Sequence, residues 1–373
     1  MKRKLKICSP QLGISPTSSL GGEIYDYQTL KGFTQKGIDV FVYLPKDRPY
    51  DKKLNHFHIT YAFVKHIVPP WIYSFICLLY LFRTYKKEKF DILRIHSPRF
   101  LGLSAIIFHF FYSKVPILTS QVTVDPSPIY YPIEWLTFRI SKRIIVQSEY
   151  MKNLLIKKYH VSSAKIAVTY GGQLDAPIKL RAIPVKAKPI SSESPVILFM
   201  GVLVKRKNPL FLVDILKNCK KVIPKLKLVI IGTGPLKNGL VKKLKTEHLL
   251  NDTVLIDSAY GKEKTFWFTR MNIFLMPSWD EGFGLAVTEA MSFAKPVITS
   301  DKAAFKEIIA NGQNGYTLPL ENPSEWVKTI VGLIRYPNIA KKIGNSAQKS
   351  VIEKFSWGKT YRLNYQVVKE MIR

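Results

Sequence analysis

Short apolar runs alternate along this chain with longer stretches whose apolar residues have helical spacing. The alternation is typical of parallel sheets, because a crossover helix must connect neighbouring parallel strands. Residues 176–195 interrupt it, and their prolines, lysines and serines give them the composition of a linker. The pattern predicts an α/β chain with Rossmann-like domains at 1–175 and 196–354, which suits a length of 373 residues.

The predicted strands are short and mostly rich in Val, Ile and Leu. In the first domain they are Leu5–Ser9, Val40–Leu44, Ile92–His96, Pro116–Thr119, Arg143–Gln147 and Ile166–Tyr170. In the second domain they are Val196–Met200, Lys227–Ile231, Val254–Ile256, Ile273–Met276 and Pro296–Thr299.

The segment that says most about function follows the strand Ile273–Met276. There, a turn with two glycines leads into a helical pattern at Leu285–Phe293. Loops at the carboxyl ends of parallel strands hold ligands in open α/β sheets. Glu281 and Glu289 frame this turn, with seven residues between them. Amides that open a helix suit an anion, and one carboxylate can accept hydrogen bonds from both ribose hydroxyls. The turn therefore suggests a nucleotide-sugar site.

A glutamate pair with this spacing is more often simply a solvated helix face. Its position favours function, because Glu281 lies in a glycine turn directly after one strand and the strand Pro296–Thr299 follows the helix.

The chain resembles the retaining GT-B glycosyltransferases, in particular the family 4 group that uses nucleotide-diphosphate sugars. Motifs of this family occur in the expected order over nearly the whole chain. They are LGGE at Leu20–Glu23, IIVQSEYMKNLL at Ile144–Leu155, VILFMGVLVKRKNP at Val196–Pro209, LVIIGTGP at Leu228–Pro235, the block from Phe274 to Asp301, and KEIIANGQNGYTL at Lys306–Leu318. The resemblance implies two Rossmann-like domains facing across a cleft, and a last segment, 355–373, that crosses back to the first domain.

For the donor side, the resemblance implies that Glu289 binds the ribose and that Glu281 faces the sugar and the reaction centre. Lys207 and Arg206 would bind the diphosphate, with Glu281 and Lys207 as the catalytic residues. The family's Gly-Arg-Leu is Gly-Val-Leu here, with Val202 in place of the arginine, and Arg206 is the candidate substitute. Solvated loop charges are the alternative for both cations.

Glycine turns complete the implied donor site. Gly232 and Gly234 resemble the turn beside the nucleotide, and the amides of residues 282–285 would hold diphosphate or sugar hydroxyls. The residues involved are Gly22, Gly232, Gly234, Gly282, Phe283, Gly284 and Leu285.

On the acceptor side, Gly21 and Glu23 belong to a glycine loop expected to close over phosphates and acceptor. Many relatives carry a histidine after the fourth strand, and here Gln121 stands there, followed by Asp125. His96 ends a strand and either faces the cleft or has a packing role. An alanine pair beginning at Ala303 replaces a usual glycine pair, so the local pocket is expected to differ.

A formal net charge of +31 calls for an anionic partner or extensive solvation. The apolar stretches Pro70–Phe82 and Phe100–Tyr112 are too short to span a bilayer. Each is either a buried helix or an aromatic surface that enters an anionic membrane, since lysines and an arginine follow. A surface that is basic by lineage is a further alternative, and no nucleic-acid-binding motif is present.

Other features limit the chemistry. Three widely separated cysteines argue against a disulfide framework or a zinc site, and the apolar stretch at the amino terminus is too short for a signal peptide. No Asp-x-Asp pair follows a strand, so we expect no metal and no cofactor, with the nucleotide-diphosphate sugar as donor substrate.

The predicted protein is a retaining, metal-independent hexosyltransferase that uses UDP- or GDP-hexose and a lipid-linked or surface-glycan acceptor. We expect it in the cytoplasm, peripheral to the inner face of the cell membrane, with no nucleic-acid partner. A GT-B sugar-nucleotide epimerase is the alternative, and a basic nucleic-acid-binding protein is a remote one.

Overall fold

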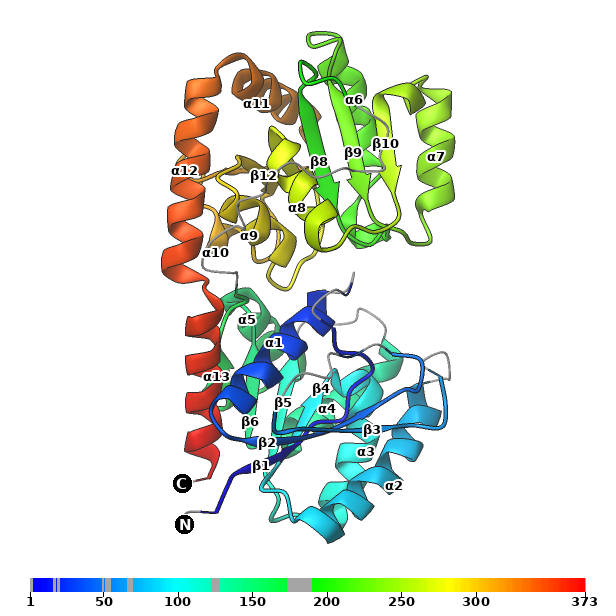
Figure 1. Cartoon of the computed structure of the whole chain (residues 1–373), viewed down its shortest axis with the longest axis vertical. Helices are drawn as coiled ribbons and strands as arrows, with labels where there is room; N and C mark the ends of the chain where they lie inside the picture. Colours follow the sequence, from blue (N-terminus) through cyan, green and yellow to red (C-terminus); the bar gives the residue numbers. More distant parts are fainter. Residues whose placement is uncertain are drawn as a thin grey trace. The chain divides into compact units, whose positions relative to one another are not determined.

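The computed structural model describes residues 3–15, 18, 21–48, 50, 55–65, 70–121, 128–172 and 190–372. The chain divides into two compact units (Figure 1). Unit 1 comprises Met1–Tyr170 and Trp357–Arg373, and unit 2 comprises Gly171–Ser356. Of the predicted linker, 176–195, residues 176–189 lie outside the described residues.

Unit 1 is a seven-stranded parallel sheet with the strand order β3-β2-β1-β4-β5-β6-β7. Its strands are β1 (Lys6–Cys8), β2 (Asp39–Leu44), β3 (Phe57–Tyr61), β4 (Ile92–His96), β5 (Ile117–Gln121), β6 (Arg143–Val146) and β7 (Ile166–Val168). Its helices are α1 (Gly21–Gln35), α2 (Pro70–Glu88), α3 (Pro98–Phe111), α4 (Tyr131–Ile140), α5 (Glu149–Tyr159) and α13 (Trp357–Met371).

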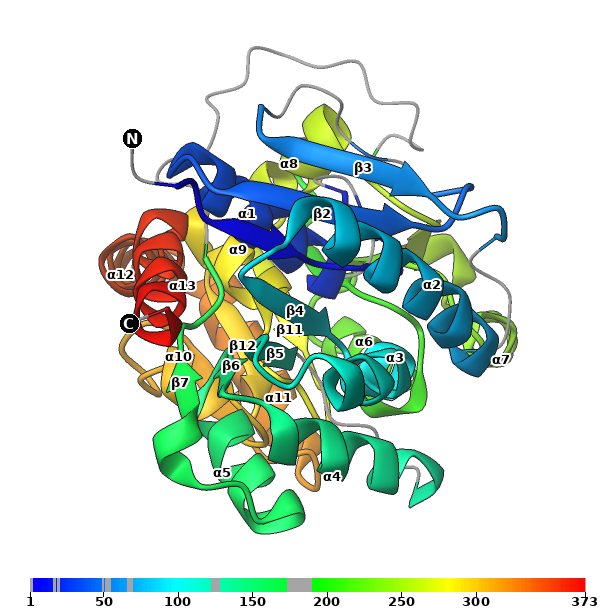
Figure 2. The ribbon, with the colours of Figure 1, turned by 90° about the horizontal axis from the view of Figure 1, so that it is seen from below.

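Helices cover both faces of this sheet (Figure 2). Successive residues of a strand point to opposite faces, so Ile7 and Cys8 of β1 enter different cores. Ile7 packs in the core with Leu30 of α1 and Val368 of α13. Cys8 packs in the core that α2 and α3 supply. Burial on both faces explains the continuous apolar runs that predicted these strands.

Unit 2 is a six-stranded parallel sheet with the order β10-β9-β8-β11-β12-β13. Its strands are β8 (Val196–Met200), β9 (Lys227–Ile231), β10 (Thr253–Ile256), β11 (Ile273–Met276), β12 (Val297–Ser300) and β13 (Tyr316–Leu318). Its helices are α6 (Phe211–Lys220), α7 (Lys237–Thr246), α8 (Gly261–Arg270), α9 (Leu285–Ser292), α10 (Phe305–Ile308), α11 (Pro323–Arg335) and α12 (Pro337–Lys354).

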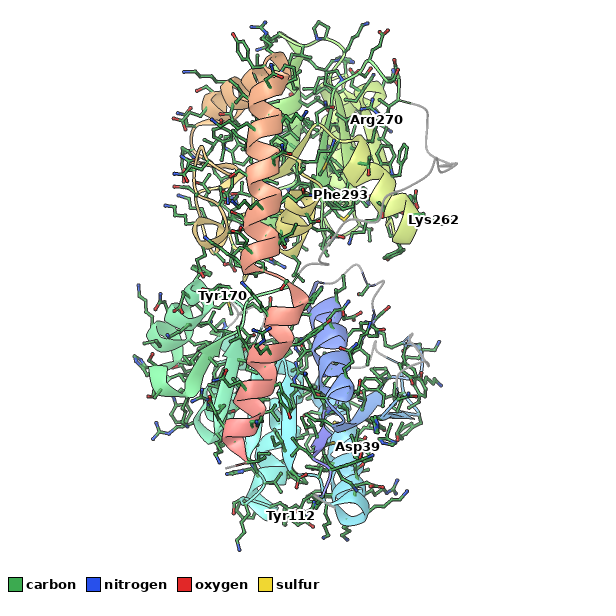
Figure 3. All side chains as sticks on the ribbon, turned by 60° about the vertical axis from the view of Figure 1, so that its left-hand side comes forward. Asp39, Tyr112, Tyr170, Lys262, Arg270 and Phe293 are labelled. Atoms are coloured by element: carbon green, nitrogen blue, oxygen red, sulfur yellow. The ribbon has the colours of Figure 1, made fainter. Side chains whose placement is uncertain are left out.

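The chain that enters β8 is fixed by Arg270, at the end of α8 (Figure 3). Its guanidinium donates hydrogen bonds to the carbonyl oxygens of Ser191 and Ser194, at 2.7 Å and 2.9 Å. The segment that leads into β8 is thereby tied to the end of α8.

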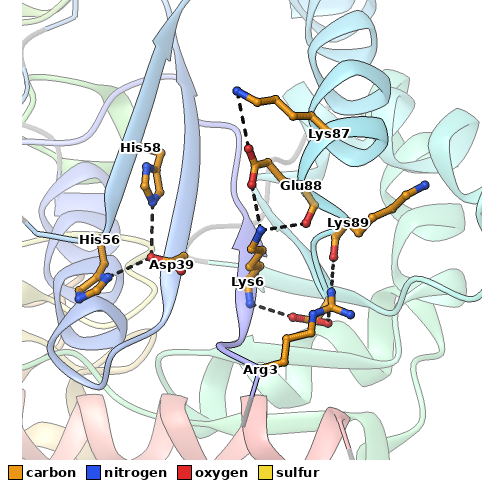
Figure 4. Close-up of polar contacts among 9 residues, drawn as sticks. Arg3, Lys6, Asp39, His56, His58, Lys87, Glu88 and Lys89 are labelled. Carbon is orange, nitrogen blue, oxygen red and sulfur yellow. Dashed lines mark hydrogen bonds and ion pairs between the residues drawn. The ribbon is translucent and has the colours of Figure 1, made fainter. Parts of the chain in front are cut away.

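Polar contacts between side chains connect the strands and α2 at one end of unit 1 (Figure 4). Asp39 of β2 lies 2.9 Å from His56 and 3.4 Å from His58, so it links β2 to the edge strand β3. Lys6 of β1 contacts Glu88 of α2 at 2.9 Å. These pairs fix the ends of elements whose apolar residues face the core.

The two apolar stretches form most of α2 and α3, and each helix has a buried and an exposed face. Tyr73 and Leu81 of α2 are in the core, whereas Trp71, Phe75 and Leu79 are 60%, 50% and 58% exposed. The buried-helix prediction is therefore right for only one face of α2. In the described part of the chain, helices that combine the length and the apolarity of a membrane span are absent.

Candidate functional site

The turn between β11 and α9 has the backbone that its glycines predict. Gly284 precedes the first helical residue with φ of +101°, a left-handed conformation that favours glycine. A Cβ atom at this position would lie 3.0 Å from the ring of Phe305. The carbonyl of Glu281 accepts a hydrogen bond from the amide of Ala304, at 3.4 Å. The turn is thus tied to the chain that follows β12.

Glu281 and Lys207 form a close ion pair, although 73 positions of sequence lie between them. Their side chains are only 12% and 10% exposed. Lys207 ends a short 3-10 turn, η3 (Lys205–Lys207), which follows β8. Arg206 approaches the same carboxylate at 3.7 Å and donates a hydrogen bond to the carbonyl of Asp280 at 3.2 Å. The structure therefore brings these three predicted residues together.

Charges of both signs meet at this pair. Two cations, Arg206 and Lys207, lie beside the carboxylate of Glu281, and Asp280 adds a further negative charge that acts on Lys207. Burial lowers the pKa of Lys207, and the negative charge of Glu281 opposes that shift. A diphosphate at this position would be attracted to both cations.

Glu289 lies on α9 and pairs with Lys264 of α8 at 2.6 Å. Both side chains are about one quarter exposed, at 25% and 22%, so the pair is accessible from solvent. Lys264 was not predicted, because a lysine near the start of a polar helix is usually only a solvated charge. Each of the two predicted carboxylates is thus held by its own lysine.

Gly232 and Gly234 allow the loop after β9 to pack against the loop after β8. A Cβ atom at Gly232 would lie 2.0 Å from the carbonyl oxygen of Gly201, and one at Gly234 would lie 2.7 Å from that of Leu203. The amide of Leu203 donates to the carbonyl of Thr233 at 2.9 Å. These glycines therefore support the segment that leads to the 3-10 turn carrying Lys207.

Phe283 lies inside the turn rather than at its surface. Its side chain is 1% exposed and packs edge-on against Phe355, with ring centroids 5.4 Å apart. A Cβ atom at Gly171 would lie 2.5 Å from the same ring. The neighbouring Gly282 is buried and Leu285 is half-buried. Phe283 therefore supports the turn, and its predicted donor contact would come from the backbone.

In unit 1, Gly21 and Gly22 open α1. The side chain of Glu23 turns back toward the loop after β1, where its carboxylate accepts a hydrogen bond from Ser18 at 2.6 Å. It also lies 3.4 Å from Arg48. These contacts hold the start of α1. The acceptor role of Gly21 and Glu23 and the donor role of Gly22 remain predictions.

His96 and Gln121 lie at the carboxyl-terminal end of the parallel strands of unit 1, because each is the last residue of its strand. His96 is 17% exposed and contacts Asp26 of α1 at 2.6 Å. Gln121 is buried, and Asp125 lies outside the described residues. The part of His96 in acceptor binding stays a prediction, as does that of Gln121.

Asp26 was not predicted as a functional residue, because an aspartate in a helix is usually solvated. It is fully buried against Arg94, which is also fully buried. Burial would raise the pKa of Asp26, but the charges of Arg94 and His96 outweigh it and lower the pKa below its usual value. The contacts of Asp26 with Arg94 and His96 are formed by the tertiary structure, so the sequence alone does not indicate them.

Within the described ranges, no cluster of three His, Cys, Asp or Glu side chains could hold a metal ion. Metal independence therefore remains a prediction for experiment.

Two family models match adjoining parts of the chain. The model described as glycosyl transferases group 1 matches residues 183–350, and that described as glycosyltransferase family 4 matches residues 21–172. The chain belongs to the GT-B glycosyltransferases of the family 4 type. Both the predicted resemblance and the predicted fold class are confirmed.

Curated relatives of this glycosyltransferase are distant. A D-inositol 3-phosphate glycosyltransferase of Streptomyces bingchenggensis is 24% identical over 62% of this chain and 53% of its own length. The UDP-Gal:alpha-D-GlcNAc-diphosphoundecaprenol alpha-1,3-galactosyltransferase of Escherichia coli is 26% identical over 68% of this chain and 69% of its own length. This chain spans about half the length of several curated relatives that it matches.

A solved structure shows the same fold. The Anabaena protein HepE, in complex with UDP and glucose, superimposes with a TM-score of 0.79. The match covers 98% of this glycosyltransferase and 99% of the Anabaena chain, at 16% identity. At that identity the likeness establishes the architecture alone.

Proposed function

We propose that this chain is a retaining glycosyltransferase that moves a hexosyl group from a UDP- or GDP-hexose to a lipid-linked or surface-glycan acceptor. The observation that carries the proposal is the buried contact of Glu281 with Lys207, with Arg206 beside it. Two adjacent cations beside a carboxylate at a glycine turn suit a diphosphate with an attached sugar.

In the proposed reaction, the bond between the anomeric carbon and the diphosphate oxygen breaks on the face where the acceptor oxygen bonds to that carbon. The departing diphosphate receives the acceptor proton. Lys207 and Arg206 would stabilise the charge that develops on the leaving group, without a metal ion. Glu281 would orient the sugar and stabilise the reaction centre rather than attack it.

Glu289 and Lys264 suit the ribose of the donor. The carboxylate can accept hydrogen bonds from two vicinal hydroxyls, whereas the ammonium group can donate to a hydroxyl oxygen. Their partial exposure leaves the pair open to a ligand. Ribose binding would therefore rearrange an existing ion pair without burying an isolated charge.

Two relatives support the choice of substrates. The HepE structure contains UDP and glucose, and the name of the Escherichia coli relative specifies a diphosphoundecaprenol acceptor. We extend both to this chain as a class, a nucleotide-diphosphate hexose and an acceptor on a lipid or glycan.

We place the protein at the inner face of the cell membrane. Trp71, Phe75 and Leu79 recur every four residues along α2, so they form one exposed stripe. Phe110 and Phe111 of α3 are 83% and 63% exposed, and Phe111 packs against Phe82 of α2. Exposed basic residues follow these apolar stretches in the sequence: Arg83, Lys86, Lys87, Lys89 and Lys114. Apolar side chains beside cations suit an anionic bilayer surface.

A donor panel tests the proposed reaction. Purified protein is incubated with each UDP- or GDP-hexose and a lipid-linked acceptor, and proton NMR follows the anomeric signals. We expect transfer from one donor with the anomeric configuration retained, and loss of transfer in Glu281→Gln. The control is Lys243→Gln, which breaks the Lys243–Asp214 pair elsewhere in unit 2. A new epimer without transfer, or a product of inverted configuration, would contradict the proposal.

A further inference from the structure

Unit 1 contains a pocket that neither the family nor the proposed reaction assigns. Its volume is about 340 Å³, and it lies between the end of α4 and the segment that joins α5 to β7. Both helices end where the next strand begins, so the pocket lies at the amino-terminal edge of the sheet. His96 and Gln121 end their strands at the opposite edge, which separates the pocket from the predicted acceptor residues.

Aromatic and aliphatic side chains form the inner wall of this pocket. Phe138 and Tyr159 are almost fully buried and meet edge-to-face, with ring centroids 5.0 Å apart. The hydroxyl of Tyr159 donates to buried Glu134, so its polar end is already occupied. Val161 and Trp135 complete an apolar lining, which suits a planar or hydrocarbon group.

Two cations lie among the lining residues, without a neutralising acid. The guanidinium of Arg139 lies 5.2 Å from the ring centroid of Trp135, and Lys165 donates a hydrogen bond to the carbonyl of Arg139 at 2.8 Å. Among the described residues neither cation has a carboxylate within ion-pair distance, whereas nearby Arg143 pairs with Glu370 at 3.1 Å. Burial and the neighbouring charge of Arg139 lower the pKa of Lys165. An anion would relieve this repulsion.

We propose that this pocket binds a small organic anion, with a planar ring against Trp135, Phe138 and Tyr159 and a phosphate or carboxylate at Arg139 and Lys165. Charge-assisted hydrogen bonds would fix the anionic group, and burial of the ring would add affinity. The volume is near the lower end of ligand pockets, about 300–1,000 Å³, which selects a compact ligand.

Phenyl phosphate is the probe, and the ¹⁹F resonance of Trp135 in protein labelled with 5-fluorotryptophan is the readout. Trp135→Phe assigns that resonance, so binding is detected at this pocket and not at the donor site. We expect saturable binding of phenyl phosphate. Inorganic phosphate and phenol should each bind more weakly, by about tenfold or more. Lys165→Gln and Arg139→Gln should each weaken the binding of phenyl phosphate by about tenfold.

Lys142→Gln is the matched control, because Lys142 also donates to a helix carbonyl, that of Met371 at 2.7 Å. It should leave the affinity for phenyl phosphate within about twofold. Equal affinity of wild type and both pocket variants would overturn the proposal. So would equal affinities for phenyl phosphate and inorganic phosphate, because the aromatic wall would then contribute nothing. The readout does not depend on glycosyl transfer, so it can fail or succeed independently of the proposed function.

Discussion

Oδ2 of Asp26 lies 2.6 Å from Nδ1 of His96, while Oδ1 of the same carboxylate contacts Arg94. One buried carboxylate on α1 thus holds two side chains of β4, a cation inside the core and a half-buried imidazole at the end of the strand. Removal of the carboxylate would leave Arg94 without its ionic partner in the protein interior.

We therefore expect Asp26→Asn to destabilise the protein by about 3–5 kcal/mol, the usual cost of breaking a buried ion pair. Urea unfolding followed by circular dichroism measures this loss. Asp39→Asn is the comparison, because Asp39 pairs with His56 and His58 at a more exposed position and should cost less. Equal losses in the two variants would contradict the assigned role of burial.

The same carboxylate predicts how stability depends on pH. Because the pKa of Asp26 is lower in the folded protein than in the unfolded chain, its contribution is complete above the unfolded value of about 4. That contribution is lost as the pH falls through the lowered pKa. The free energy of unfolding of wild type should therefore decrease more steeply in acid than that of Asp26→Asn. Parallel curves for the two proteins would show that Asp26 is not responsible.

For the donor site, Lys207→Ala, Glu289→Gln and Lys264→Met should each weaken UDP or GDP binding by about 10- to 100-fold, since each removes a charged hydrogen-bonding group. Isothermal titration calorimetry measures the affinity, and circular dichroism checks the fold. Lys243→Ala, which removes an ion pair of the same length as Lys264–Glu289, should bind like wild type. Wild-type affinity in all three site variants would refute the site.

Transfer activity should persist after treatment with EDTA, because in the proposed reaction Lys207 and Arg206 would supply the positive charge that other transferases take from a metal ion. The measurement is the initial rate before and after chelation, with magnesium or manganese added back. Loss of activity that either ion restores would show that the two side chains are insufficient.

Vesicle flotation should separate the electrostatic and the apolar contributions of the proposed membrane-binding surface. Replacing Lys86, Lys87 and Lys89 by Gln should reduce binding to anionic vesicles by about 100-fold, from about 1 kcal/mol for each charge. Replacing Trp71, Phe75 and Leu79 by Ser should instead remove the fraction of vesicle-bound protein that high salt does not release. Lys242→Gln, an exposed lysine of unit 2, is the control. Absence of wild-type flotation at low salt would exclude this surface as a membrane contact.

The central strands were predictable from the sequence because burial on both faces demands continuous apolar residues. Four of them, β4, β8, β9 and β11, begin and end where predicted. The predictions missed β3 and β13, which lie at sheet edges. Most residues of β3 retain solvent contact, and its alternating His58 and Thr60 give no apolar run.

The candidate donor site was predictable in part, since glycine turns and the spacing of Glu281 and Glu289 are local features of the sequence. The partners of these carboxylates were less accessible. Lys207 was expected at the diphosphate, but its contact with Glu281 depends on the adjacency of β8 and β11. Lys264 and Asp26 act through tertiary contacts that no local pattern encodes.

The helix α13 affects how this chain can fold during translation. Val367, Val368 and Met371 complete the core that β1, β2 and α1 begin, more than 300 residues earlier in the sequence. The ribosome therefore cannot supply all of unit 1 until the codons for Trp357–Arg373 have been read. Unit 2 is contiguous and is complete in sequence at Ser356, before unit 1. Domains synthesised first generally fold first, but here the amino-terminal core must wait, with an apolar face uncovered, while the later unit is made.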